Sequence, residues 1–162
     1  MLSLSIILES LDIVKRLEFI PVSSDEVLDM NLTIFDDIDK NNLPSDFYTT
    51  DHYKIMLDDF FVGVIGYKSF YDTWKDVPNM IQGEQGKHSL WIQMLEIRKE
   101  ARNKIGNPLV LIKSVFDYLN DYCKQNDFKS ILCAAKTERI ASLYRRVGFI
   151  GMDKDHLFYL VK

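Results

Sequence analysis

The sequence predicts a mixed α/β fold in a single domain that spans residues 1–162. In its second half, short apolar segments alternate with longer helical patterns, and in its first half two apolar segments flank Asp58-Asp59 as a hairpin would. A chain of 162 residues can bury roughly two-thirds of its unfolded surface. The apolar fraction of 47% and the aromatic fraction of 12% exclude intrinsic disorder.

The first half predicts two helices and a β-hairpin. Residues 1–16 are expected to form an extra N-terminal helix, and residues 17–22 a first strand. Ser23 and Glu26 form a capping-box pattern that opens a second helix. The apolar residues that define the two helices are Leu4, Ile7, Leu8, Leu11 and Val14, and then Val27, Met30, Ile34 and Ile38.

The rest of the chain continues with strands and helices in alternation. The polar segment 41–51 predicts a loop or an irregular helix, and strands are expected over 53–57, 60–71 and 88–97, with a long connection over 72–87. The second half predicts a helix from Pro108, a helix over 137–147, an apolar strand covered on both faces and two closing strands. These last three strands are expected over 129–135, 149–152 and 156–161.

Composition excludes several classes of function. The net charge of −4 gives no electrostatic footprint for nucleic acid. Cys123 and Cys133 lie in apolar periodic segments, which predicts buried thiols and a cytoplasmic chain rather than a disulfide or a metal site. His52, His88 and His156 match no metal-ligand spacing. No apolar run approaches the roughly 20 residues of a membrane span, and the N-terminus lacks the basic start of a signal peptide.

The most informative segment is the predicted helix over 137–147 and the residues that follow it. Leu143 and Val147 lie one turn apart, so both can face the core, and Tyr144 projects from a neighbouring edge. Gly148 can end the helix in the left-handed conformation, and Phe149 resumes apolar structure. The alternative interpretation is an ordinary core helix that carries an amphipathic tyrosine.

A second candidate site is the predicted strand-to-helix turn over 98–107. Such a turn leaves backbone N–H groups free at the helix N-terminus, where the dipole adds about half a positive charge. Asn107 is a good N-cap and Pro108 a good first helical residue. Four basic residues crowd the turn, so a pyrophosphate would fit it, although a solvated turn balanced by Glu96 and Glu100 is the alternative. The four are Arg98, Lys99, Arg102 and Lys104.

The pattern Ala141-x-Leu143-Tyr144-x-x-x-Gly148-Phe149 resembles the C-terminal signature of the GNAT superfamily of N-acetyltransferases. The turn resembles that family's Q/R-x-x-G-x-G/A motif, and the resemblance covers roughly residues 91–162. Without a gap, Arg102 takes the Q/R place, and Ile105 and Asn107 replace the glycines. With a shift of one residue, Gly106 keeps the final glycine, and Ala101 and Lys104 replace the other two key residues.

The resemblance implies a mostly antiparallel central sheet flanked by helices, and acetyl-CoA as co-substrate without a metal. It makes Tyr144 the donor to the departing sulfur. A backbone amide near a bulge in the fourth strand, around Leu95 to Ile97, would stabilise the thioester oxygen. Thr137 takes the upstream position of the final motif. The residues implied for the CoA pyrophosphate are Arg98, Arg102, Asn103, Lys104, Ile105, Gly106 and Asn107.

The acceptor amine must lose a proton, and a carboxylate could remove it. Glu96 is the best-placed candidate base, with a strand residue paired to a basic neighbour as its alternative; Glu84 and His88 are weaker candidates. The acidic second helix suits a cationic acceptor, a small-molecule or protein amine, unless its acids form a solvated face. These acids are Asp25, Glu26, Asp29, Asp36, Asp37 and Asp39.

Three functional interpretations remain open. The first is an acetyl-CoA-dependent N-acetyltransferase that acts on a primary amine. The second is an acyltransferase of the same fold with another acyl donor or acceptor, and the third is a CoA-binding or interaction module without turnover. The connection over 71–88, with Trp74, Met80 and Ile81, could be a substrate lid or a dimer contact. A homodimer is one partner that the resemblance implies.

Overall fold

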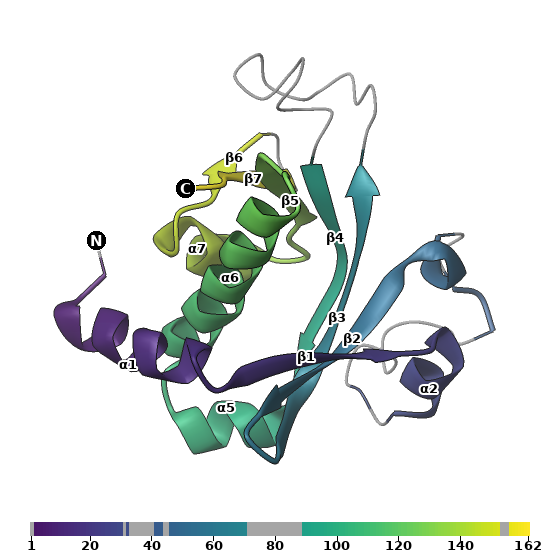
Figure 1. Cartoon of the computed structure of the whole chain (residues 1–162), viewed down its shortest axis with the longest axis horizontal. Helices are drawn as coiled ribbons and strands as arrows, with labels where there is room; N and C mark the ends of the chain where they lie inside the picture. Colours follow the sequence, from purple (N-terminus) through teal and green to yellow (C-terminus); the bar gives the residue numbers. More distant parts are fainter. Residues whose placement is uncertain (1, 31, 33–40, 44–45, 71–88, 153–155) are drawn as a thin grey trace.

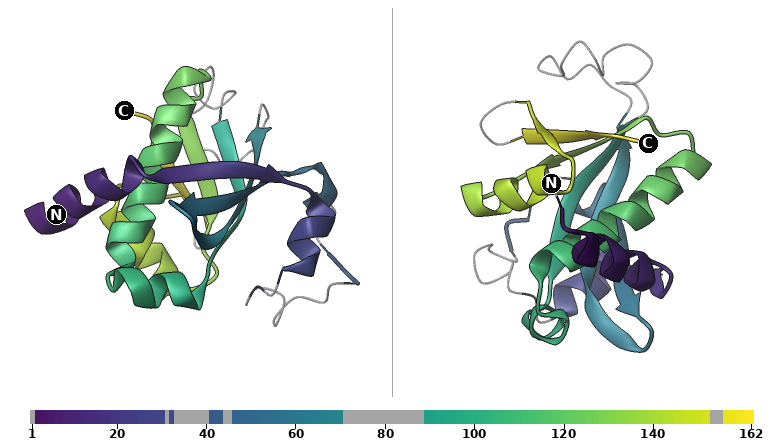
Figure 2. Two further views of the ribbon diagram at one scale, coloured as in Figure 1. Left: turned by 60° about the horizontal axis from the view of Figure 1, so that its bottom comes forward. Right: turned by 90° about the vertical axis from the view of Figure 1, so that its left-hand side faces the viewer.

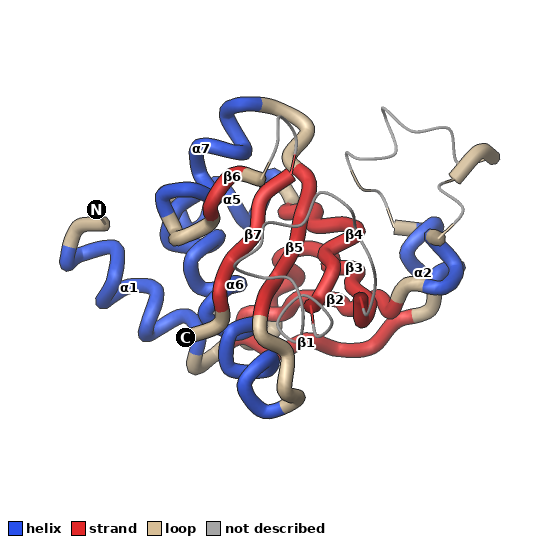
Figure 3. Tube along the Cα trace, turned by 90° about the horizontal axis from the view of Figure 1, so that it is seen from above, coloured by secondary structure: helices blue, strands red, loops and turns tan. Residues whose placement is uncertain are grey.

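A seven-stranded sheet in the order β1-β2-β3-β4-β5-β7-β6 forms the centre of the computed structural model, with helices on either side (Figures 1 and 3). The structure describes residues 2–30, 32, 41–43, 46–70, 89–152 and 156–162. All neighbouring strands pair antiparallel except β4 and β5, which pair parallel, so the predicted mixed and mostly antiparallel sheet is confirmed. The elements are α1 (Leu4–Val14), β1 (Leu17–Val22), α2 (Ser24–Asp29), the 3₁₀ turn η1 (Phe47–Thr49), β2 (Asp51–Leu57), β3 (Phe60–Phe70), β4 (Ser89–Ile97), α5 (Lys99–Ile105), α6 (Pro108–Gln125), β5 (Ser130–Ala134), α7 (Glu138–Arg146), β6 (Ile150–Gly151) and β7 (His156–Leu160).

Most of the predicted elements in the first half are present. The predicted capping box opens α2, because Ser23 and Glu26 each accept from the backbone of the other. Helix α2 is shorter than its predicted apolar stripe, because the backbone of Met30 is already extended, with φ −74° and ψ 141°. The Met30 side chain packs against the sheet. Ile34, Ile38 and the connection over 72–87 lie outside the described residues.

The two larger hydrophobic clusters lie on opposite faces of the sheet. Figure 1 shows α6 and α7 on one side of the sheet and α2 on the other. The main core joins the sheet to α6 and α7, and includes Ile65, Ile92 and Leu119. The second cluster, here called the α2 cluster, consists of Val27, Leu32, Phe47, Val64 and Met94. Ile65 and Val64 follow each other on β3 and belong to different clusters, as expected when successive side chains point to opposite faces. The predicted buried thiols are confirmed, because Cys123 and Cys133 are both buried and free.

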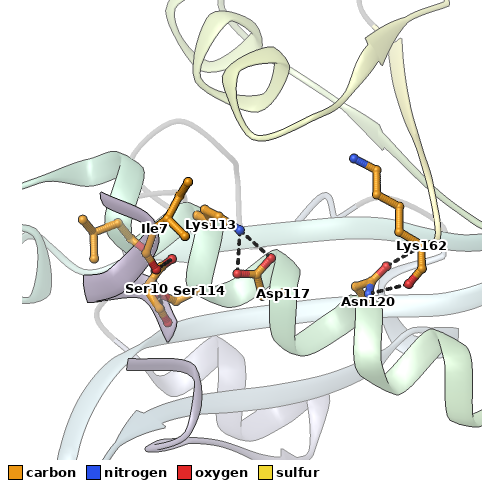
Figure 4. A network of polar contacts seen from close by, with 8 residues as sticks. Ile7, Ser10, Lys113, Ser114, Asp117, Asn120 and Lys162 are labelled. Carbon is orange, nitrogen blue, oxygen red and sulfur yellow. Dashed lines mark hydrogen bonds and ion pairs between the residues drawn. The ribbon is translucent and has the colours of Figure 1, made fainter. Parts of the chain in front are cut away.

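Two residues in the interior of helix α6 contact distant parts of the chain (Figures 2 and 4). Ser114 is fully buried against α1; its hydroxyl donates to the Val110 oxygen at 2.6 Å, and the Ser10 oxygen of α1 lies 3.4 Å away. Further along, Asn120 accepts from the Lys162 amide at 2.9 Å and donates to the Lys162 oxygen at 3.3 Å. These contacts hold α6 in a defined position beside β4.

Strands β4 and β5 pair only at the start of β4. Their parallel register runs from Ser89↔Ser130 to Ile92↔Cys133, and the two serine hydroxyls of the first pair lie 2.6 Å apart. From Met94 to Ile97, β4 still pairs with β3, but from Gln93 onward no described strand pairs with its other edge. The backbone N–H and C=O groups of a strand point alternately to its two edges. Some of those in this segment therefore point to the edge that does not pair with β5.

A β-bulge lies at the point where this pairing ends. Gly66 of β3 pairs with Met94, and the next residue, Tyr67, pairs with Ile92, which leaves Gln93 as the extra residue. The bulge shifts the alternation of side chains, since Ile92 belongs to the main core, Met94 to the α2 cluster and Leu95 again contacts the main core. It therefore lies before the expected position at Leu95 to Ile97. Beyond Ile92, β4 no longer has to keep register with two neighbours, and the extra residue fits there.

Candidate active site

Two adjoining cavities, of about 170 and 340 Å³, lie along the edge of β4 that does not pair with β5. Side chains from β4, α5 and α7 line both of them, and residues of α6 complete the smaller one. The larger one continues to Cys133 and Lys136 at the end of β5 and the start of the next loop. The residues common to both cavities are Leu95, Glu96, Arg102, Ile140 and Tyr144.

Tyr144 is placed in the site by the boundaries of α7. Thr137 caps the helix by accepting from the Ile140 amide at 3.2 Å and also lines the larger cavity, and Gly148 follows the helix with a left-handed φ of 115°. Ala141 and Tyr144 form the buried face of α7. Leu143, which was expected to face the core, is only half-buried and lines the smaller cavity instead.

The Tyr144 ring is held by aromatic packing. Its centroid lies 5.4 Å from that of Phe116, edge to face, and 5.5 Å from that of Phe149. No described residue forms a hydrogen bond with the hydroxyl, although the side chain is only 7% exposed. Burial raises the pKa of Tyr144, and the neighbouring Cys133 raises it further. The group is therefore a neutral hydroxyl at pH 7, able to donate a hydrogen bond into the cavity.

The expectation of an open turn over 98–107 is wrong for most of that segment, which forms helix α5. The amides of Ala101 and Arg102 donate to the Arg98 oxygen at 3.1 and 3.2 Å, and the Gly106 amide donates to the Arg102 oxygen at 3.0 Å. Residues 99–105 contain no glycine or proline and are rich in helix formers, so their own propensity favours a helix. Gly106 then ends α5 with a φ of 80°.

The start of α6 agrees with the sequence prediction. Asn107 is the N-cap, with its side chain accepting from the Leu109 amide at 3.0 Å, and Pro108 is the first helical residue. The Val110 amide donates to the Asn107 oxygen at 3.2 Å. Pro108 has no N–H, and the next two amides already bind Asn107. No amide of residues 108–110 is therefore left free for a ligand.

The basic residues of this region differ in their surroundings. Arg98 donates to the Phe61 oxygen at 3.0 Å and lies over the Phe61 ring. Lys104 lies 4.3 Å from the centroid of Phe60, at the hairpin between β2 and β3. Arg102 is exposed, lines both cavities and has no partner among the described residues. Among the cations of α5, Arg102 is thus the one that lines the cavities and can meet an anion there.

The other predicted residues are distributed around the cavities. Glu96 is half-buried on β4, lines both cavities and has no ionic partner among the described residues. Ile97 lines the smaller cavity, and Ile105 packs against the main core. Asn103 is exposed on α5 and lines neither cavity. The alternative bases Glu84 and His88 lie outside the described residues.

Sequence reasoning missed Gln93 and Lys136, which both line the larger cavity. For Gln93 a signal was present, because it is a polar residue in the interior of the otherwise apolar segment Leu90–Leu95. Its Oε1 atom is buried and has no hydrogen-bond partner among the described residues. Lys136 gave no such signal, since an exposed lysine after a strand is ordinary.

Within the part of the chain that the structure describes, no group of histidine, cysteine and carboxylate side chains is arranged to hold a metal ion. No described helix is both long and apolar enough to cross a membrane.

Comparisons with known proteins identify the fold. No family model matches the chain, and no curated protein matches it by sequence. Among solved structures, it is similar to a GNAT-family acetyltransferase from Staphylococcus aureus Mu50, with 16% identity, a TM-score of 0.59 and coverage of 90% of this chain and 99% of that one. It is also similar to FeeM, an N-acyl amino acid synthase from uncultured soil microbes, with 10% identity, a TM-score of 0.60 and coverage of 90% and 92%. A third is a SpeG spermidine N-acetyltransferase chimera from Vibrio cholerae, with 12% identity, a TM-score of 0.52 and coverage of 90% and 95%. The chain thus has the GNAT acetyltransferase fold, as its C-terminal motif predicted.

Proposed function

From this fold, we propose that the chain transfers the acetyl group of acetyl-CoA to a primary amine. One observation carries the proposal: Tyr144 and Arg102, the two residues that the sequence motifs assign to the sulfur and the phosphates, line the same pair of cavities. They lie on different helices and 42 positions apart in the sequence. An ordinary core helix and an ordinary basic turn would have no reason to meet at one site.

The free edge of β4 suits the extended, amide-containing arm of CoA. Backbone groups of Gln93–Ile97 that face the cavities can hydrogen-bond to such an arm in the manner of an added strand. The phosphates would then lie toward α5, where Arg102 offers a planar guanidinium that can bind phosphate oxygens in pairs. Lys136 lines the larger cavity from the β5–α7 loop and offers a further cation. Since Asn107 caps α6 and the amides of Ala101 and Arg102 bind the Arg98 oxygen, we expect side-chain cations to supply most of the phosphate affinity.

The chemistry is acyl transfer between a thioester and an amine. The amine nitrogen attacks the thioester carbonyl, the oxygen becomes an oxyanion, and an N–H of β4 beside the bulge at Gln93 would stabilise it. The C–S bond then breaks and CoA leaves as a thiolate, to which the Tyr144 hydroxyl donates a hydrogen bond. Thiols have a pKa of about 8.5 and tyrosine of about 10, so complete proton transfer is uphill by about 2 kcal/mol even before burial is counted. Hydrogen bonding is therefore the role that we assign to Tyr144.

The proton of the attacking amine leaves through Glu96 or water. A lysine-like amine, with a pKa of about 10.4, is almost fully protonated at pH 7 and must lose this proton to become a nucleophile. The acids of α2, Asp25, Glu26 and Asp29, line neither cavity and could attract a cationic acceptor only at longer range, while the net charge of −4 disfavours an acceptor carried on a nucleic acid. A polyamine, an aminoglycoside or a lysine side chain satisfies both conditions.

The proposal is tested by titrating acetyl-CoA into the protein calorimetrically, and then measuring the release of CoA thiol with a panel of amines. We expect saturable binding and thiol release that depends on a cationic amine. Release with a longer acyl-CoA, but not with acetyl-CoA, would instead indicate an acyltransferase with another donor. Binding without turnover of any amine would indicate a CoA-binding module, and absence of binding would refute the proposal.

A further inference from the structure

We propose that Arg98 and Lys104 are positioning residues, which fix helix α5 to the β2–β3 hairpin and thereby hold Arg102 in the cavities. The sequence motif suggested both of them as phosphate ligands. This inference rests on the proposed function, because it concerns how the phosphate end of the same site is built. It goes further by separating the two cations that fix the helix from the one that meets the ligand.

Helix α5 is attached to the start of β3 through a cation at each of its ends (Figures 1 and 2). Arg98, its N-cap, donates to the Phe61 oxygen at 3.0 Å, and the guanidinium carbon lies 4.7 Å from the centroid of the Phe61 ring. In the last turn, Nζ of Lys104 lies 4.3 Å from the centroid of the Phe60 ring. Phe60 packs against the main core and Phe61 against the α2 cluster, so the two contacts hold β3 from opposite faces of the sheet.

The geometry of α5 points Lys104 away from the cavities. Residues two positions apart are separated by about 200° around a helix, so Arg102 and Lys104 lie on opposite sides of it. Between them lie Ala101 and Ile105, which pack against the main core. Arg102 lines both cavities of the site, whereas Lys104 lines a separate cavity of about 370 Å³ at the hairpin, together with Asp58.

Arg98 also connects β3 to the first turn of α5 through its backbone. Its N–H donates to the Val62 oxygen at 2.9 Å, and its own oxygen accepts from the amides of Ala101 and Arg102 at 3.1 and 3.2 Å. The side chain lines neither cavity, and its Nε lies 3.6 Å from the Glu100 carboxylate, which would compete with an anionic ligand. Displacement of Arg98 would therefore move Arg102, to which it is directly bonded.

The first test is amide hydrogen exchange in the unliganded protein, which does not depend on CoA. Arg98→Leu and Lys104→Leu each remove a cation and keep an apolar side chain. Lys99→Leu is the matched control, because Lys99 is an exposed basic residue of α5 without a partner among the described residues. The amides of Arg102 and Gly106 report on the first and last turns, since both donate within the helix.

We expect these two amides to exchange at least about threefold faster in Arg98→Leu and Lys104→Leu, and at the wild-type rate in Lys99→Leu. Exchange in the other helices should match the wild-type protein, which shows that the fold is intact. The conservative variants Arg98→Lys and Lys104→Arg keep a cation over each ring. They should therefore restore much of the protection.

The second test is acetyl-CoA affinity, measured by calorimetry in a double-mutant cycle with Arg102→Leu. We expect Arg98→Leu and Lys104→Leu each to weaken binding by about threefold or more, beyond the effect of Lys99→Leu, which measures the long-range loss of one charge. In the Arg102→Leu background, neither change should weaken binding further than Lys99→Leu does. The residue through which they act is then absent.

Three results would overturn the assignment. Unchanged exchange in both variants would show that these contacts do not fix α5. Faster exchange with unchanged affinity would show that they do not position Arg102. A loss of affinity that persists in the Arg102→Leu background would make Arg98 or Lys104 a direct ligand. Failure of the proposed function is distinguishable, because it appears as absent acetyl-CoA binding by the wild-type protein, while hydrogen exchange still tests how α5 is held.

Discussion

The ring of Tyr144 meets the ring of Phe116 edge to face, with centroids 5.4 Å apart and an interplanar angle of 85°. Phe116 belongs to α6 and lies between Ser114, which packs against α1, and Asn120, which bonds to Lys162. The position of the Tyr144 hydroxyl is therefore set by packing against a fixed helix, and not by hydrogen bonds from described residues. Removing the hydroxyl should leave this packing intact, so its contribution to chemistry can be measured separately from its contribution to folding.

Tyr144→Phe should lower turnover by about tenfold or more, because the departing thiolate loses its hydrogen-bond donor. The free energy of unfolding should change by less than about 1 kcal/mol, since no described partner is left unpaired. Acetyl-CoA affinity should hold. The matched control is Tyr159→Phe, a buried tyrosine whose ring lies 5.3 Å from Phe149 and which lines neither cavity. Equal turnover in the wild-type protein and Tyr144→Phe would make Tyr144 purely structural.

Arg102→Glu should weaken acetyl-CoA binding by about tenfold or more, because a cation facing the phosphates is replaced by an anion. The wild-type affinity should fall as salt is added, and the affinity of the variant should fall less steeply, since fewer attractive charges remain to be screened. Calorimetry at two salt concentrations measures both effects. Lys124→Glu, an exposed reversal in the last turn of α6, serves as the control for the change in net charge. If both reversals give the same affinity, Arg102 is not a phosphate ligand.

Glu96→Gln should reduce the rate most at low pH, where the acceptor amine is most fully protonated and needs a base. Alkaline pH should partly restore the rate, because it supplies neutral amine from solution. Glu18→Gln, an exposed change on β1, should match the wild-type pH–rate profile. If Glu96→Gln also keeps that profile, the base is water or another carboxylate.

Burial of His52 should make the stability of the fold depend on pH. Burial lowers the pKa of His52, and the nearby charge of Asp51 opposes this only in part. Below the ordinary histidine pKa of about 6.5, the unfolded chain takes up a proton that the folded chain resists, so stability should fall as the pH drops through this range.

The measurement for His52 is denaturant unfolding of the wild-type protein and His52→Leu at several pH values between 7.5 and 5. The titration of carboxylates is common to both proteins and cancels in the difference. We expect the difference in unfolding free energy to move in favour of His52→Leu as the pH falls. A difference that is independent of pH would show that His52 takes up its proton as readily in the folded state as in the unfolded one.

Local sequence patterns correctly predicted the elements that are determined by contacts between residues close together in the sequence. Strand β1 and the hairpin of β2 and β3 followed from apolar segments and the turn at Asp58-Asp59, and the start of α6 from Asn107 and Pro108. Helix α5 was missed because the family pattern suggested a glycine-rich turn, while the residues present are helix formers. Motif and propensity conflicted there, and the structure follows propensity.

The sequence predicted the site residues that belong to a motif. It did not predict the part of the site that depends on strand pairing between distant segments. Tyr144 and Arg102 were found from motifs, and the structure brings both to one pair of cavities. The position of the bulge depends on where β5 stops pairing with β4, and that is decided by residues about forty positions apart in the sequence. Gln93 was therefore recognised as a cavity residue only when the bulge was located.

A crystal structure of the protein with CoA tests the central claim most directly. We predict that the arm of CoA lies along the Gln93–Ile97 edge of β4, with its sulfur within hydrogen-bond distance of the Tyr144 hydroxyl and its pyrophosphate beside Arg102. CoA bound elsewhere, or with its sulfur remote from Tyr144, would contradict the account.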